Sequence, residues 1–570
     1  MTAMKRYFIT LMLILAAALP LSGSVVERTF ITTDKDVYVA GDNVWISAFC
    51  VDAGSGLLSG ASSVAYIELH NGTETVQDCK IALRKGRGAG SFTLNATLPT
   101  GNYRIVAYTA LNKAEAGYDY EGVASKTISV FNTLSKERVK GGVKVIPPEE
   151  YASLGNGTPE SSSGGIDIAV GESESGSGFI PVRITNNGRS AASVSVSVYH
   201  EDGIRHPDNP APADFAAALK QVRRSGTEPG AMLEYEGEVI RGRIVGAGED
   251  LLDSLKGRYA FISAPGNGFD IYASRIADDG TVLFRTGNIY GTRDLICEIE
   301  GLDSSNVCHL ELDDPFTRSV VPAAAPLAVS ESVAPALKER SIAMQIERRF
   351  ASDSLFWNYK VRSNTFLGAD RIRYALDDFT RFPLMKEVFT EIVHEIKVSG
   401  NSRRGRTLSV GLMDAFGRVL PPSRESLILL DGVPVFENDK IYNYDPLLVK
   451  YIDIYPYVHV VGTRFYDGVV NFVTYKGNMP SMTFGGNVRI VNFKGVSFPR
   501  AYTCHTLLPG SGYPDYRQTV YWYPLAGIEP GGSFEDSVKI PDYPGTFTIV
   551  VEGFDQAGGP VRAKSSFVIK

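Results

Sequence analysis

The sequence lacks the short motifs that mark the common enzyme classes. None of its seven histidines falls in an HExxH arrangement, so the usual two-histidine zinc site of metalloproteases is absent. It has no G-x-S-x-G segment, which excludes a hydrolase built on that turn, and no Walker loop for phosphates. We therefore predict a protein that is not an enzyme, with no catalytic residues, no metal site and no cofactor.

An excess of positive charge is also missing. Lysine and arginine number 57 against 64 aspartates and glutamates, which gives a net charge of −7. Binding to nucleic acid or to an anionic membrane surface needs a clustered positive face. We expect no nucleic-acid partner.

Cysteine is scarce, with five residues in the chain. Two alternatives are open for four of them. Either Cys50 pairs with Cys79 and Cys297 pairs with Cys308, leaving Cys504 single, or these residues are buried thiols in strands. Their spacing does not match a zinc site.

Long hydrophobic runs are absent after the first residues. The opening "MTAMKRYFITLMLILAAALPLSGS" has a basic start, about a dozen apolar residues and a small-residue end, which is typical of a secretory signal peptide. The apolar run is shorter than the ~20 residues of a membrane-spanning helix. We predict an exported protein of the periplasm, outer membrane or cell surface, without a transmembrane span of its own.

What the chain does contain is the pattern of a β protein. Glycine is abundant at 57 residues, and tyrosine and phenylalanine number 28 each. Short alternating segments such as "SVSVSVYHED", separated by Gly and Asn turns, predict antiparallel sandwiches. The predicted fold is therefore mostly β and multidomain, with tandem antiparallel β-sandwiches of immunoglobulin-like architecture and one small α/β domain near the C-terminus. The expected segments are a signal peptide (1–24), a sandwich (25–132), a linker (133–165), two β modules (166–230 and 231–330), a helical connector (331–365), a small α/β domain (366–480) and a C-terminal sandwich (481–570).

Helical spacing appears in two segments of the second half. Residues 334–351 place Leu337, Ile342 and Ile346 close to one face, and residues 379–398 repeat the pattern after Pro383. The sequence predicts a helix over each segment.

The segment "SLILLDGVPV" predicts a hairpin in the α/β domain. "LILL" is continuously apolar, as expected for a strand covered on both faces. Asp431 and Gly432 form a two-residue turn signal of type I′. "DPLLVKYIDIY" predicts a short helical turn followed by a strand, and "GVVNFVTYK" a further strand.

Two families resemble parts of this sequence. "TTDKDVYVAGDNVWISAF" and "LPTGNYRIVAYT" resemble the first and later strands of a macroglobulin-like domain of the MG2 type. The Cys-Gly-Glu-Gln thioester run of protease-trapping macroglobulins is absent, so the resemblance does not imply covalent capture.

"LILLDGVPV", "DPLLVKYIDIY" and "YDGVVNFVTYKG" resemble, in this order, the plug domain of TonB-dependent outer-membrane receptors. Such a receptor needs a barrel of roughly 22 strands after its plug, and the residues after Gly477 are too few for one. The whole arrangement resembles a class of exported Bacteroidetes proteins that carry these two domains.

The resemblances imply a non-enzymatic binding or scaffold protein of the cell envelope. We expect a partner in the outer membrane, of the TonB-dependent transporter type or an assembly complex. The alternative is a secreted or surface-attached β-sandwich adhesin. The expected partner-binding residues are Asp431, Gly432, Val433, Pro434, Tyr455, Tyr457 and His459.

Overall fold

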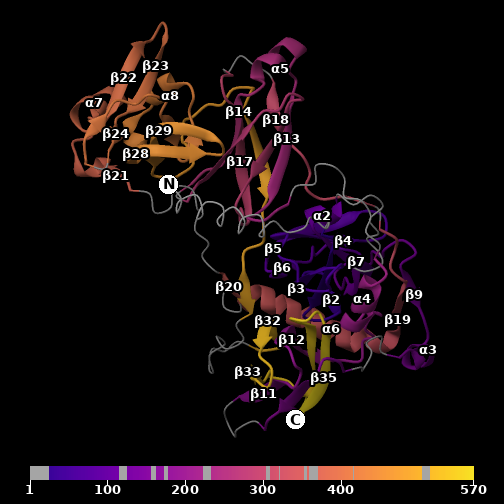
Figure 1. Cartoon of the computed structure of the whole chain (residues 1–570). Helices are drawn as coiled ribbons and strands as arrows, with labels where there is room; N and C mark the ends of the chain where they lie inside the picture. The colour runs from indigo at the N-terminus through magenta and orange to yellow at the C-terminus, as the bar shows by residue number, and fades with distance from the viewer. Residues whose placement is uncertain are drawn as a thin grey trace, which may run out of the picture. The chain divides into compact units, whose positions relative to one another are not determined.

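The computed structural model confirms that the protein is mostly β, with multiple sheets (Figure 1). It describes residues 25–113, 125–155, 162–172, 178–222, 233–266, 268–302, 308–319, 321–351, 356–358, 370–414, 416–502 and 514–570. The predicted signal peptide and Cys504 lie outside these residues. The chain forms two compact units, unit 1 (residues 1–235, 318–358 and 499–570) and unit 2 (residues 236–317 and 359–498).

Unit 1 begins with a β-sandwich of eight strands. Its strands alternate in sequence, and their inward side chains, such as Ile31, Ile46, Ile67 and Ile105, share one core. The strand order is β1 (Glu27–Thr33), β3 (Asn43–Asp52), β6 (Arg87–Thr93), β5 (Thr75–Arg84), β4 (Val64–His70), β7 (Gly101–Tyr108), β8 (Ser125–Phe131) and β2 (Val37–Val39). A short helix, α2 (Ala110–Lys113), lies between β7 and β8 in the sequence.

The second sandwich of unit 1 combines strands from both ends of the chain. One sheet has the order β10 (Ile166–Val170), β11 (Phe179–Asn186) and β33 (Ser533–Lys539). The other has the order β32 (Thr519–Ile528), β12 (Ala192–Glu201), β34 (Gly545–Asp555) and β35 (Pro560–Ile569).

This sandwich differs from the predicted segments, which separated a module at 166–230 from a sandwich at 481–570. In the structure β12 lies between β32 and β34, and Ala192 to Glu201 pair with Asp555 to Thr546. Alternation shows that a strand has a buried face, but it does not show which distant strand pairs with it. The two predicted modules are halves of one core.

The remaining elements of unit 1 pack around these sandwiches. The predicted linker contains structure, because Ile146 and Tyr151 are buried in a cluster with Val37 and Phe131. The elements are β9 (Val143–Val145) paired with β19 (Leu327–Val329), β20 (Phe356–Asn358) paired with β31 (Arg500–Tyr502), α3 (Pro148–Ser153), α4 (Pro212–Leu219), the 3-10 turn Glu331–Val333, α6 (Ala334–Ile346) and the π-helical turn Glu347–Ala351.

Helix α6 confirms the predicted helix but not its predicted face. Ile342 is 46% exposed, whereas Arg340 is 3% exposed. Arg340 is buried because its guanidinium is bound by an acidic partner in the same unit, as described below. Hydrophobic spacing therefore placed the helix and missed the charged residue on its inner face.

Unit 2 contains a smaller sandwich and an α/β domain. One sheet of the sandwich has the order β16 (Thr281–Arg285), β13 (Val239–Val245) and β18 (His309–Leu312). The other has the order β15 (Asp270–Arg275), β14 (Tyr259–Ala264), β17 (Thr292–Ile299) and β30 (Arg489–Lys494). Helix α5 (Glu249–Leu255) precedes β14 in the sequence. Strand β30 comes from the segment predicted to start the C-terminal sandwich. It pairs with β17 over Thr292 to Cys297.

The α/β domain is built on a five-stranded sheet. Its order is β21 (Ile372–Ala375), β28 (Val449–Val461), β29 (Arg464–Thr474), β26 (Leu427–Leu430) and β27 (Val433–Pro434). Around the sheet lie α7 (Met385–Glu391), α8 (Asn438–Tyr442), the 3-10 turns Leu376–Asp378 and Pro446–Leu448, and the hairpins β22 (Ile396–Asn401) with β23 (Gly405–Val410) and β24 (Leu412–Met413) with β25 (Val419–Leu420).

The hairpin prediction in this domain is confirmed. Leu427–Leu430 are all buried and pair in parallel with β29. Asp431 and Gly432 have φ angles of +50° and +87°, as a type I′ turn requires. The helix predicted over 379–398 is shorter, because α7 ends at Glu391 and Ile396 begins β22. The β-branched Ile392, Val393 and Ile396 reach the same core from a turn and a strand.

Candidate binding site

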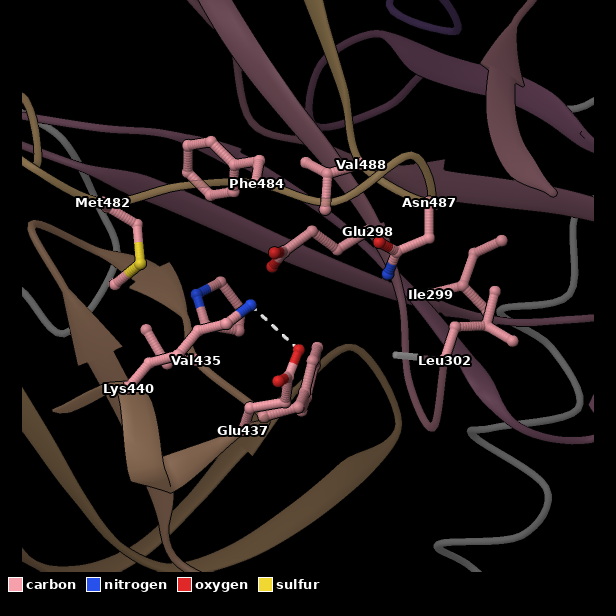
Figure 2. A pocket seen from close by; sticks show the side chains of 12 residues that line it. Glu298, Ile299, Leu302, Val435, Glu437, Lys440, Met482, Phe484, Asn487 and Val488 are labelled. Atoms are coloured by element: carbon pink, nitrogen blue, oxygen red, sulfur yellow. Dashed lines mark ion pairs between the residues drawn. The ribbon is translucent and has the colours of Figure 1, made fainter. Parts of the chain in front are cut away.

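A pocket in unit 2 lies where the sandwich meets the α/β domain. It is a concave site that is partly open to solvent. Figure 2 shows side chains from β17, from the segment after β27, from α8 and from the loop before β30 converging on it. The lining residues are Glu298, Ile299, Leu302, Pro434, Val435, Phe436, Glu437, Lys440, Met482, Phe484, Asn487 and Val488.

The alternation of β17 aims Glu298 at the α/β domain. Leu295 and Cys297 belong to the core of the sandwich, whereas Ile296 belongs to the core of the α/β domain. Glu298 follows Ile296 by two residues and therefore shares its face of the sheet. Its cross-strand neighbour, Phe261 of β14, packs in the cluster between the two domains.

The carboxyl group of Glu298 is buried, and its hydrogen-bonding capacity is not fully used. The residue is 8% exposed, and its Oε2 has no hydrogen-bond partner among the described residues. Burial raises the pKa of Glu298 to about 8; the charge of Lys440 opposes this rise and the charge of Glu437 adds to it. At neutral pH the group is therefore mostly protonated.

The charged rim of the pocket comes from α8 and the residue before it. Lys440 Nζ lies 2.8 Å from Glu437 Oε1, an i,i+3 pair (Figure 2). Lys440 is paired with Glu437, and its charge offsets only part of the effect of burial on Glu298. The pocket thus holds two carboxyl groups and one ammonium group.

The opposite wall is apolar. Met482, Phe484 and Val488 line it, with the Asn487 amide beside them, and Ile299 and Leu302 close the side toward β17. An apolar wall with a few convergent polar groups is the usual composition of a ligand site. This arrangement can bind a small group, but it presents no nucleophile next to a base.

The predicted contact hairpin is interior rather than exposed. Asp431, Gly432, Val433 and Pro434 are all buried. Asp431 accepts hydrogen bonds from Thr474 N at 2.7 Å, Thr474 Oγ1 at 2.6 Å and Met479 N at 2.7 Å. A Cβ added to Gly432 would lie 2.1 Å from the Phe269 ring. The turn is a packing element between sheets, which corrects the expected surface role.

The predicted contact residues Tyr455, Tyr457 and His459 differ in how deeply they are buried. Tyr455 is buried in the cluster that includes Phe261 and Tyr466, and its ring stands edge-on to His459 with centroids 5.8 Å apart. Tyr457 is half-buried, with its hydroxyl 3.8 Å from the Met413 sulfur. The structure brings Tyr455 and His459 together, but none of the predicted contact residues except Pro434 lines the pocket.

The four described cysteines are buried thiols, which is the second of the alternatives left open by the sequence. Burial raises the pKa of Cys50 far above its usual value and that of Cys297 to about 12. The thiols of Cys50 and Cys297 are therefore protonated, and so weak nucleophiles, at neutral pH.

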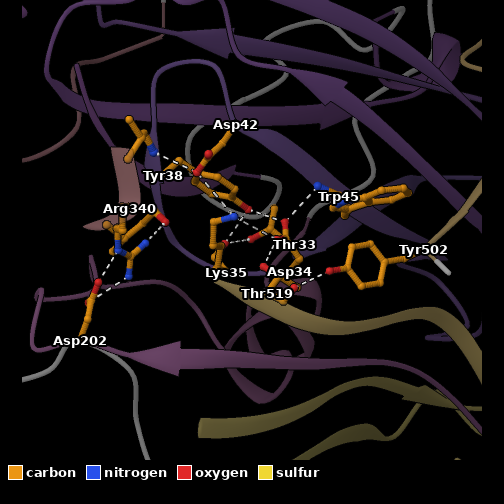
Figure 3. A network of polar contacts seen from close by, with 12 residues as sticks. Thr33, Asp34, Lys35, Tyr38, Asp42, Trp45, Asp202, Arg340, Tyr502 and Thr519 are labelled. Atoms are coloured by element: carbon orange, nitrogen blue, oxygen red, sulfur yellow. Dashed lines mark hydrogen bonds and ion pairs between the residues drawn. The ribbon is translucent and has the colours of Figure 1, made fainter. Parts of the chain in front are cut away.

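Unit 1 contains a buried polar network of a different character. Asp34 accepts hydrogen bonds from Trp45 N at 3.0 Å, Tyr38 Oη at 2.8 Å and Thr519 Oγ1 at 2.5 Å (Figure 3). Thr519 belongs to β32, so this carboxylate joins the N-terminal sandwich to the second one. The "DK" residues of the macroglobulin-like motif therefore act in packing.

A second part of this network fixes α6. Arg340 donates from Nε to Asp202 Oδ2 at 2.5 Å, from the second amino nitrogen to Asp202 Oδ1 at 3.0 Å, and to the Val37 carbonyl at 2.7 Å (Figure 3). The guanidinium of Arg340 and the carboxylate of Asp202 therefore satisfy each other's hydrogen-bonding groups inside the unit, and this pair does not form a ligand site.

Within the described residues we find no cluster of three or more His, Cys, Asp or Glu side chains able to hold a metal ion. In the same part of the chain, no helix has the length and apolar character needed to cross a membrane.

The first sandwich is similar to a known protein family. Residues 28–125 match the MG2 domain, from the second residue of β1 to the first residue of β8. This match supports the macroglobulin-like resemblance of the N-terminal segment. No curated protein matches the chain.

Several solved structures share low similarity with the chain. Trypsin-activated alpha-2-macroglobulin from Escherichia coli is 9% identical, with a TM-score of 0.23, over 95% of this chain and 41% of that one. Salmonella alpha-2-macroglobulin reacted with methylamine is 9% identical, with a TM-score of 0.24, over 96% and 40%. The Escherichia coli adhesin FdeC is 10% identical, with a TM-score of 0.15, over 49% and 62%. The chain thus spans about two fifths of the length of these macroglobulins.

Sequence reasoning missed the pocket residues Glu298, Lys440 and Asn487. One signal was present: "LICEIEGL" places two acidic residues at alternate positions of an apolar strand. Glu300 has a partner, Arg464, at 2.6 Å, and the sequence does not reveal that Glu298 has none.

Proposed function

We propose that this is a non-catalytic interaction protein of the cell envelope or the extracellular space. Unit 1 serves as its rigid support and unit 2 carries the recognition site. The MG2 match at residues 28–125 supports the first part, because such sandwiches are binding and structural modules. The mostly β architecture, with several sandwiches in one chain, fits a protein that makes contacts rather than one built around a catalytic centre.

The observation that carries the proposal is the pocket around Glu298. A protein interior normally satisfies or neutralises a buried carboxyl group, and a polar group left over in a concave site marks a candidate binding position. In unit 1 the buried Asp34 and Asp202 have partners within the chain. In unit 2 Glu298 faces a pocket instead.

A finer hypothesis makes the protein an accessory of an outer-membrane transporter of the TonB-dependent type. Its support is the plug-like order of the α/β domain: a helix, the type I′ hairpin, a 3-10 turn and two long paired strands, β28 and β29. A surface-attached or secreted adhesin is the competing hypothesis. It uses the same modules without a transporter partner.

A pull-down separates these hypotheses. The tagged full-length protein is recovered from native envelopes of its own cells in mild detergent, and the bound proteins are identified by mass spectrometry. Recovery of one barrel protein at near-equal abundance supports the accessory role. Recovery of a different, non-barrel ligand, or release of the protein to the medium with its ligand, supports the adhesin. Recovery of no partner under either condition overturns the proposed function.

A further inference from the structure

The chemistry of the pocket allows its ligand to be specified. The pocket holds the carboxyl groups of Glu298 and Glu437 and the ammonium group of Lys440. Lys440 Nζ forms an ion pair with Glu437 Oε1 at 2.8 Å. An anion entering the pocket would meet an uncompensated carboxyl group. A cation would meet Glu298 Oε2, a buried carboxyl oxygen without a hydrogen-bond partner among the described residues.

The apolar wall sets the second requirement. Met482, Phe484 and Val488 line the side of the pocket opposite α8 (Figure 2). They favour a ligand whose charged end continues into an alkyl chain, as in a lysine side chain, because such stems bury well against apolar surface.

We propose that this pocket binds the ammonium end of an alkylamine. Glu298 accepts hydrogen bonds from the ammonium group, and Met482, Phe484 and Val488 pack against the alkyl stem. The amine belongs either to a lysine side chain of a protein ligand or to a small free amine. This inference rests on the proposed function, since it names the chemistry recognised at the same site.

Binding of an ammonium group is coupled to release of a proton. Glu298 is mostly protonated at pH 7, and the ligand requires its ionised form. The charged groups facing it are Glu437 and Lys440, while Glu300, just after β17, is paired with Arg464 at 2.6 Å. Affinity should therefore weaken about tenfold per pH unit below the Glu298 pKa of about 8.

The test uses the full-length protein and three defined probes. These are n-butylamine, Nα-acetyl-lysine N-methylamide and Nα-acetyl-norleucine N-methylamide, which has the same stem without the amine. Binding is followed by saturation-transfer NMR and by calorimetry at pH 6, 7 and 9, in buffers of different ionisation enthalpy. The supporting result is binding of the lysine probe but not of the norleucine probe, with uptake of a proton by the buffer at pH 7 and none at pH 9.

Two variants locate the site. Glu298→Gln keeps the shape of the side chain and should weaken binding at pH 9 by about tenfold or more, because a charge-assisted hydrogen bond is lost. It should also abolish the pH dependence. Glu311→Gln, at an exposed position of β18, is the matched control and should bind as the unmodified protein does.

The outcomes separate this inference from the proposed function. Binding of butylamine without binding of the lysine probe supports the alkylamine site and identifies a free amine as its source. Equal binding of the norleucine probe, or unchanged binding by Glu298→Gln, overturns the inference. If no probe binds while the pull-down still recovers a partner, the inference fails and the proposed function stands.

Discussion

Asp202 in unit 1 and Glu298 in unit 2 are carboxyl groups placed in opposite electrostatic settings. The Asp202 side chain is 6% exposed; burial alone would raise its pKa, but the charge of Arg340 and its hydrogen bonds lower it. Glu298 is also buried, but its pKa rises to about 8. The difference teaches that a partner, and not burial, decides whether a buried acid serves packing or remains available to a ligand.

The largest expected effect is loss of the Asp202 partner. Arg340→Met leaves the Asp202 carboxylate buried without a counter-charge and should lower the free energy of unfolding of unit 1 by about 3–5 kcal/mol. All three tryptophans, Trp45, Trp357 and Trp522, belong to unit 1, so urea unfolding followed by tryptophan fluorescence reports on this unit. The double variant Arg340→Met/Asp202→Asn should recover part of the loss. Equal stability of Arg340→Met and the unmodified protein would contradict the comparison.

Removing the Glu298 charge should raise the stability of unit 2, whereas Arg340→Met should lower the stability of unit 1. Its pKa is raised from 4.5 to about 8 in the folded protein, so the folded state holds more protons between these values and unit 2 loses stability as pH rises through this window. Glu298→Gln removes this dependence and should stabilise unit 2 by about 4 kcal/mol at pH 8, with little effect near pH 4.5. Hydrogen exchange of β17 and β26 peptides measures it. Slower exchange in the unmodified protein at pH 8 would show that Glu298 has a partner.

His206 in unit 1 extends the comparison from buried acids to a buried basic group. His206 lies 3.5 Å from Asp36 and 3.6 Å from Glu201; burial disfavours its charge, but these carboxylates outweigh burial and raise its pKa to about 9. Its contribution is complete below its unfolded pKa near 6.5 and is lost as pH rises through 9. His206→Gln should therefore cost about 3 kcal/mol at pH 6 and much less at pH 9.5. The pH dependence of the tryptophan-detected urea midpoint measures this. A variant whose midpoint falls equally at both pH values would argue against a charged His206.

The smallest expected effect comes from an exposed ion pair. Arg183 Nε lies 2.9 Å from Glu535 Oε1, with both side chains more than half exposed. Water screens such a pair, so Arg183→Ala should change the stability of unit 1 by less than about 0.5 kcal/mol. The same fluorescence assay measures it. A loss as large as that of Arg340→Met would mean that exposure does not separate the two kinds of pair.

The sequence by itself determined the local structure of this protein. Alternating strands gave the mostly β class, "LILL" gave a strand covered on both faces, and Asp431-Gly432 gave the type I′ turn, because side-chain periodicity and turn conformation depend on neighbouring residues. The macroglobulin-like motif was likewise readable in the residues that match the MG2 domain.

Only the tertiary structure decided which distant segments share a core. The pairing of β12 with β32 and β34, and of β17 with β30, joins residues hundreds of positions apart, and alternation is equally compatible with other partners. The same holds for the site. Glu298 and Glu300 look alike in the sequence, and what distinguishes them is that the fold supplies Arg464 to one and an open pocket to the other.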